Sequence, residues 1–134
     1  MKQAFTLIEL IFVIVVIGVL TSFALPKFND TREYAVANSI KQDISAISRA
    51  IKSYYLIKGD INDISDATNF NDNLWTKDST GLRLDYSIAS SSCASIEIDK
   101  APPAKLIVDI DGSSHKVCQK LVELGVKSFE EELY

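Results

Sequence analysis

The residue of this chain whose position most needs a chemical explanation is a glutamate within an apolar segment. Residues 5–25 read FTLIELIFVIVVIGVLTSFAL, and Glu9 is the one charge among them. A carboxylate in a membrane helix costs about 2–3 kcal/mol at the centre and less near an end, so it is normally kept for a purpose. The alternative is an interfacial Glu9 that is favoured only by the positive end of the helix dipole.

Other residues that commonly do chemistry are few. One histidine, His115, and two cysteines, Cys93 and Cys118, are too few for a Cys/His zinc site. The patterns GxxxxGKS/T, HExxH and GxSxG are absent, and no nucleophile or carboxylate pair is tied to His115 by spacing. The sequence therefore predicts a protein that is not an enzyme and that needs no cofactor or metal.

A group of acidic residues follows later in the chain and raises the question of calcium. Its members are Asp60, Asp63, Asp66 and Asp72. Their spacing matches no EF-hand loop, so a solvated loop is the better interpretation.

Length and charge limit the classes of function. The chain has 134 residues, which is room for one domain and an appendage. Its 14 Lys and Arg against 18 Asp and Glu give a net charge of −4, whereas a nucleic-acid binder normally carries a basic face. We therefore expect no direct contact with nucleic acid.

The apolar residues are concentrated at the N-terminal end of the chain. A helix needs about 20 apolar residues to cross a hydrocarbon core of ~30 Å, and residues 5–25 meet that length. This run is longer than the apolar region of a secretory signal peptide, and no small-x-small cleavage site closes it. The sequence predicts a transmembrane helix that stays in the mature protein.

The residues before the run are a short basic leader, Met1-Lys2-Gln3-Ala4, followed by Phe5-Thr6-Leu7-Ile8-Glu9. This opening resembles the prepilin signal of type IV pilins and of the pseudopilins of type II secretion and DNA-uptake systems. The resemblance implies cleavage between Ala4 and Phe5 by the prepilin peptidase, a membrane aspartyl enzyme that also N-methylates Phe5. One position departs from the pattern, because Ala4 stands where the family nearly always has glycine.

The resemblance also implies a function and a location. The protein would be a structural subunit of a type IV pilus-like filament, polymerised with copies of itself and other pilins from an inner-membrane assembly platform. It would begin as a single-pass inner-membrane protein with a periplasmic C-terminal domain and end in a surface pilus or a periplasmic pseudopilus. Glu9 of one subunit would meet the Phe5 amine of another, a pair that penalises wrong stagger rather than adding net stability. The alternative is a single-pass, membrane-anchored binding or sensor module that never polymerises.

The resemblance predicts an α+β, pilin-like fold. We expect a leader at residues 1–4, a transmembrane and filament-core helix at 5–26, and an amphipathic half of the same helix at 27–58. Gly59 would end that helix. Its second half has one apolar face, made by Ile40, Ile44, Ile47, Ile51 and Tyr54. Gly18 and Pro26 weaken the helix, and by resemblance it loosens between them in the filament; an ordinary membrane glycine and an interfacial proline are the alternative.

The remaining residues predict a small antiparallel sheet. Residues 59–81 are rich in Asn, Asp, Ser and Thr and read as a loop. Residues 82–134 show period-two patterns at 82–88 and 93–99, and a third strand is predicted at 105–110, between Pro102-Pro103 and the Asp111-Gly112 turn, so we expect about three to four strands. Ser114 would cap a short helix that ends at Gly125, and the acidic tail from Phe129 would be mobile.

The two cysteines enclose the last two of these predicted strands. In a small domain outside the cytoplasm, an isolated pair such as Cys93 and Cys118 is expected to form a disulfide. Two separate buried thiols are the alternative. By resemblance, the pair corresponds to the C-terminal disulfide region of many pilins.

Overall fold

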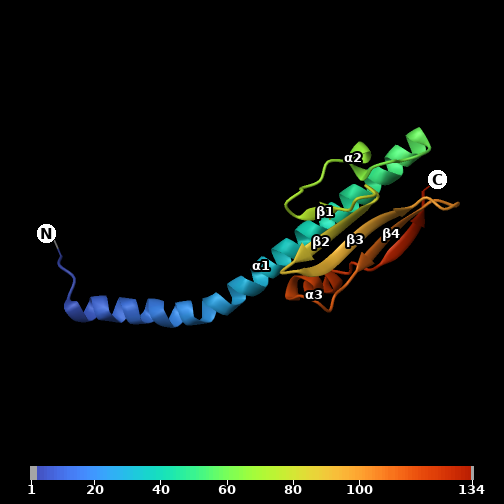
Figure 1. Cartoon of the computed structure of the whole chain (residues 1–134). Helices are drawn as coiled ribbons and strands as arrows, with labels where there is room; N and C mark the ends of the chain where they lie inside the picture. Colours follow the sequence, from blue (N-terminus) through green and yellow to red (C-terminus); the bar gives the residue numbers. More distant parts are fainter. Residues whose placement is uncertain (1–2, 134) are drawn as a thin grey trace. The chain divides into compact units, whose positions relative to one another are not determined.

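The computed structural model describes residues 3–133, including all of their side chains except those of residues 25–29. The leader residues Met1 and Lys2 lie outside the described residues. The chain divides into two compact units, Met1–Glu33 and Tyr34–Tyr134, and each is described by itself. The elements, shown in Figure 1, are α1 (Leu7–Lys58), α2 (Ile64–Ala67), β1 (Trp75–Lys77), β2 (Arg83–Ile88), β3 (Ser91–Asp99), β4 (Lys105–Ile110), α3 (Lys116–Glu123) and β5 (Phe129–Glu132).

The long helix predicted from the apolar run and the stripe behind it is α1, with 52 residues. Its backbone is helical through both Gly18 and Pro26. It ends where the sequence predicts, because Gly59 has φ +77° and its N–H donates to the carbonyl oxygen of Tyr55 at 2.7 Å. A positive φ at this position is the conformation that closes many helices and that glycine adopts without strain.

The second half of α1 supplies one wall of the hydrophobic core. Ile40, Ile44, Ile47 and Ile51 are each at most 4% exposed, and Tyr54 is half-buried. These residues recur every three or four positions and so share one face of the helix. The predicted apolar face is confirmed for its four isoleucines.

The strands form one antiparallel sheet in the order β1-β2-β3-β4-β5 (Figure 1). Alternate residues of the central strands point into the core, and their register aligns them. Leu84 of β2 pairs with Ile96 of β3, which pairs with Val108 of β4, and all three are 0% exposed. This row of side chains packs in the same core as the isoleucines of α1, which confirms an α+β, pilin-like fold.

Among the described residues the sheet has five strands, rather than the three to four that the sequence predicts, and one of the additions is the C-terminal tail. Residues 129–132 were expected to be mobile but form β5, which pairs with β4 from Phe129↔Val108 to Glu132↔Lys105. Three further contacts explain why the C-terminal tail is ordered. Leu133 is fully buried, its N–H donates to the carbonyl oxygen of Ala104, and Glu131 forms an ion pair with Lys52 of α1.

The other addition lies in the segment 59–81, which was predicted to be a loop throughout. It contains α2 and the short edge strand β1, whose Trp75 is 1% exposed. The Trp75 indole N–H donates to the Asp43 carboxylate of α1 at 3.1 Å, and its ring meets Tyr86 edge-on at 5.3 Å between centroids. A buried tryptophan whose N–H has a partner can hold a strand that local propensity does not predict.

Candidate functional site

The first turn of α1 is held by Thr6. The Glu9 N–H donates to Thr6 Oγ1 at 3.3 Å, and the Leu10 N–H donates to the Thr6 carbonyl oxygen at 3.2 Å. A hydroxyl that accepts from the third helical residue satisfies one of the free N–H groups of a helix start. This role was not among the predictions, although Thr6 and Glu9 have the spacing of a capping box.

Phe5 and Glu9 are both exposed. Phe5 precedes α1 and is 83% exposed. Glu9 is exposed in the first turn, where the helix dipole favours a negative charge. It makes no ion pair with any residue that the structure describes. The carboxylate is therefore free to pair with a cation of another molecule.

The helix behind Glu9 has no apolar partner in the described part of the chain. The segment Leu7–Ala24 has a mean hydropathy of 2.7 and is 0% buried, and it is long and apolar enough to cross a membrane. Covering such a surface with lipid or with protein removes a large apolar area from water, which is strongly favourable. The segment requires one of these environments.

Gly18 and the two hydroxyl residues after it distinguish one stretch of this helix. A Cβ at Gly18 would meet no atom within 4 Å, so packing inside the chain does not require a glycine there. Thr21 Oγ1 donates to the carbonyl oxygen of Ile17, and Ser22 Oγ donates to that of Val19 at 2.7 Å. Back-bonding of this kind satisfies the hydroxyls in an apolar environment and often bends helices. The proposed loosening between Gly18 and Pro26 stays a prediction.

Comparison with protein families identifies the start of the chain. Residues 1–25 match the family described as the prokaryotic N-terminal methylation motif. The chain carries a prepilin-type signal. This signal belongs to type IV pilins and pseudopilins, which are structural rather than catalytic proteins. Comparisons with curated proteins and with solved structures give no match.

The prepilin-type signal includes most of the residues singled out at the N-terminus. Ala4, Phe5, Glu9 and Gly18 all lie within residues 1–25, and Pro26 is the next residue. Cleavage after Ala4, methylation of Phe5 and the assembly role of Glu9 are not tested by this match and remain predictions. The match agrees with the resemblance on which they were based.

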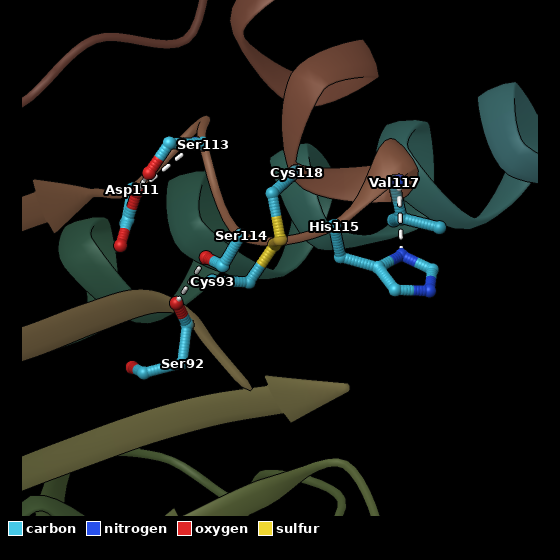
Figure 2. The surroundings of a disulfide bond; sticks show 8 residues. All are labelled: Ser92, Cys93, Asp111, Ser113, Ser114, His115, Val117 and Cys118. Atoms are coloured by element: carbon cyan, nitrogen blue, oxygen red, sulfur yellow. Dashed lines mark hydrogen bonds between the residues drawn. A yellow bond between two sulfur atoms is a disulfide. The ribbon is translucent and has the colours of Figure 1, made fainter. Parts of the chain in front are cut away.

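The second pair of residues singled out in the sequence is brought together by the fold. Cys93 of β3 and Cys118 of α3 form a disulfide, with their Cα atoms 5.4 Å apart (Figure 2). Both are at most 1% exposed. The bond holds α3 against the sheet, although the two residues are 25 positions apart in the chain.

His115 has a structural role beside this disulfide and corrects one prediction. The N-cap of α3 is His115 rather than Ser114, because the His115 Nδ1 accepts from the Val117 N–H at 3.2 Å (Figure 2). Ser114 instead donates through Oγ to the carbonyl oxygen of Ser92 at 3.2 Å. An imidazole nitrogen that accepts a backbone hydrogen bond can replace the usual hydroxyl or carboxylate cap.

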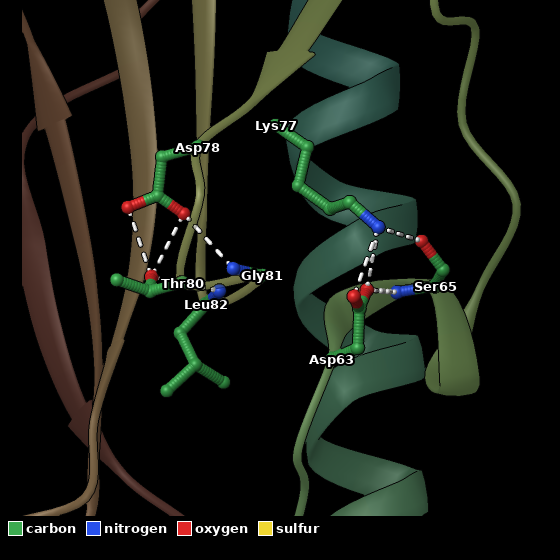
Figure 3. A network of polar contacts seen from close by, with 7 residues as sticks. All are labelled: Asp63, Ser65, Lys77, Asp78, Thr80, Gly81 and Leu82. Carbon is green, nitrogen blue, oxygen red and sulfur yellow. Dashed lines mark hydrogen bonds and ion pairs between the residues drawn. The ribbon is translucent and has the colours of Figure 1, made fainter.

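Most of the acidic residues considered for calcium are scattered or already paired. Asp63 caps α2 through the Ser65 N–H and forms an ion pair with Lys77 at 2.9 Å (Figure 3). Asp60 pairs with Lys100 at 3.0 Å. The Lys77 ammonium, followed by the Ser65 N–H, holds the pKa of Asp63 below its usual value. Within residues 3–133 no group of three or more possible ligands lies together, so the structure brings no metal site together there.

The Asp63 carboxylate also explains a neighbouring glycine. Gly81 has φ +76°, and a Cβ there would approach Asp63 Oδ2 to 2.6 Å. The Ile64 N–H donates to the Gly81 carbonyl oxygen at 2.8 Å, and Asp78 accepts from the Gly81 N–H and the Thr80 hydroxyl (Figure 3). These contacts join the two ends of the segment 63–81, which contains α2 and β1.

Proposed function

We propose that this protein is a structural subunit, pilin or pseudopilin, of a type IV pilus-like filament. The observation that carries the proposal is the prepilin-type signal at residues 1–25 joined to a helix whose apolar segment Leu7–Ala24 is 0% buried. A single segment with this surface can be covered first by lipid and later by neighbouring copies. The same features support a membrane-anchored precursor with its C-terminal domain in the periplasm.

The chemistry proposed at the N-terminus starts with hydrolysis of the Ala4–Phe5 bond by the prepilin peptidase. This frees the Phe5 amine, which the same enzyme methylates. The exposed positions of Phe5 and of the helix start support access to this bond. Alanine at position 4 is the residue closest in size to the glycine of the family, so we expect Ala4→Gly to increase the cleaved fraction.

Glu9 is proposed to set the register of assembly. After cleavage, the Phe5 amine of one copy is a cation that can pair with the Glu9 carboxylate of another. Within an apolar bundle an unpaired charge is costly, so a stagger that separates the two groups is disfavoured. The lack of an ion pair to Glu9 among the described residues supports this use, as does its position at the exposed start of α1.

The test combines two cell fractions with two variants. Mass spectrometry of the N-terminal peptide is made on sheared surface material and on washed envelope. For Glu9→Gln we expect a normal methylated Phe5 terminus and loss of the protein from filaments. The control Asp30→Asn removes an exposed carboxylate of the same helix and is expected to behave as wild type.

The outcomes separate the candidate functions. A methylated Phe5 terminus in the sheared fraction means a surface pilus subunit, and the same terminus in the envelope alone means a pseudopilin. A peptide that still begins at Met1 in both fractions would reject processing and favour an anchored binding or sensor module. Normal assembly of Glu9→Gln would reject the register role alone.

A further inference from the structure

A groove of about 410 Å³ lies between α1 and the segment that follows α3. Its apolar surface comes from Ile44 of α1 and from Val126 and Phe129 on the other side. Around this surface are three cationic side chains, Lys41, Arg49 and Lys127, and no carboxylate lines the groove.

The charges of the groove are not neutralised within the described part of the chain. Arg49 and Lys127 make no ion pair with any described residue, and Lys41 Nζ donates to the carbonyl oxygen of Leu124 at 3.3 Å. Uncompensated cations over a low-dielectric surface produce a positive potential that attracts a negatively charged partner.

One hydroxyl of the groove also lacks a partner. Ser48 Oγ is buried and makes no hydrogen bond to any described residue. Buried polar atoms are nearly always hydrogen-bonded, to protein or to ordered water, so the wall of the groove is incompletely satisfied at this residue. The apolar surface and the three cations of the groove suit an occupant that combines an apolar side chain with a carboxylate.

The same chain presents that combination just before β1. Leu74 is 39% exposed, and Asp72 is exposed without an ion pair to any described residue. Asn69 and Asn73 add exposed amide groups on either side. Residues 69–74 thus offer a large apolar side chain beside a carboxylate and hydrogen-bonding groups.

The sheet places the groove and this segment at its two opposite edges. Leu74 directly precedes the edge strand β1, whereas Phe129 begins the other edge strand, β5. Contact between unlike edges of two copies is heterologous, and repeated heterologous contacts give an open helical filament when the rotation does not close. The arrangement therefore favours a second copy as the occupant.

We propose that the groove of one copy receives residues 69–74 of a second copy, with Leu74 on the apolar surface and Asp72 facing Arg49 and Lys127. This inference rests on the proposed filament function and names the lateral contact that would propagate it. The contact lies in the second compact unit, residues 34–134, which we call the globular unit. It is therefore separate from the pairing of Phe5 with Glu9.

The first experiment maps the occupant by photo-crosslinking the full chain in cells. The crosslinking amino acid p-benzoylphenylalanine replaces Ser45 or Lys127, on opposite walls of the groove, with Ser53 on the exposed side of α1 as control. We expect a crosslink from both groove positions to the peptide 69–74 of a second copy, and none from Ser53. A crosslink elsewhere on the second copy or to another protein, or none in assembled filaments, would overturn the inference.

The second experiment reverses charges. Arg49→Glu and Asp72→Arg are each expected to lower filament yield roughly tenfold, as for a close charge pair in an interface, and the two together to restore most of it. Lys58→Glu, on the same helix outside the groove, is the control for the change in net charge. Failure of the double variant to recover, with the Phe5 terminus still processed, would reject the pairing. Absence of wild-type chain from every filament would instead reject the proposed function.

Discussion

Removing the disulfide is expected to lower the free energy of unfolding of the globular unit by about 3.5 kcal/mol. Cys93 and Cys118 are 25 positions apart. The chain-entropy relation for a loop of that length gives about 12 cal/mol/K, which is about 3.5 kcal/mol at 25 °C. This is a large fraction of the roughly 5–15 kcal/mol by which most domains are stable.

Two ways of removing the bond separate its contributions. Reduction of the wild type releases the loop but leaves both sulfur atoms in place. The variant C93A/C118A also removes these atoms from a site that is at most 1% exposed, so it is expected to lose slightly more because of the small cavity. The exposed neighbour Ser92→Ala serves as control and is expected to change stability by less than about 0.5 kcal/mol.

Trp75 provides the assay. It is the one tryptophan of the chain, it is 1% exposed, and it contacts Tyr86 in the sheet. Its fluorescence during urea unfolding of the full chain in detergent therefore reports on the globular unit. A loss below about 1 kcal/mol on reduction, with an unchanged denaturant slope, would refute the loop-entropy reasoning.

Two further predictions concern the elements that the sequence did not reveal. Leu133→Ala is expected to lower the free energy of unfolding by about 2–4 kcal/mol in the same urea experiment, because Leu133 is fully buried. The control Glu132→Ala, at an exposed residue, is expected to change that free energy little. Equal effects of the two substitutions would mean that the tail does not pack as described. Because the pKa of Asp63 lies below its ordinary 3.8, its contribution is present above that pH and lost as the pH falls through the lowered value. The protection factor of the Ser65 amide against hydrogen exchange is therefore expected to fall below pH 3.8 in wild type. It is expected to change less in Asp63→Asn, which keeps a capping side chain without the charge, and identical pH profiles of the protection factor would contradict this role.

The central strands were predictable because their patterns are local. Leu84 and Tyr86 alternate with polar residues along one strand, and Ile96 and Ile98 do so along another. Such alternation indicates a strand with one buried face, and it can be recognised without knowing which element covers that face. The stripe of isoleucines on α1 was predictable for the same reason, at the period of a helix.

The edge strands β1 and β5 were not predictable in this way. Three consecutive glutamates, 130–132, carry no alternation, and their order comes from pairing with β4 and from the burial of Leu133. In β1 the buried residue is Trp75, whose hydrogen-bond partner Asp43 is 32 positions away in the chain. Contacts of this range are decided by the assembled core.

At the N-terminus the sequence was informative because the chemistry there is local. The leader, Phe5, Glu9 and the apolar run are adjacent residues, and the helix start depends on Thr6 and Glu9, which are three positions apart. The same spacing carries the signal for the capping role of Thr6. The sequence by itself therefore determined the prepilin-type signal and the apolar helix, since neither depends on distant contacts.

Tertiary structure alone decided the groove and the groups that surround it. Arg49 and Lys127 are far apart in the chain and line one groove because α3 and the segment after it pack against α1. The disulfide holds α3 to the sheet, and Lys41 contacts Leu124 directly after that helix. Periodicity predicts which face of an element is buried, but the partner of that face is selected by the packing of the whole core, where the energy of each contact depends on all the others.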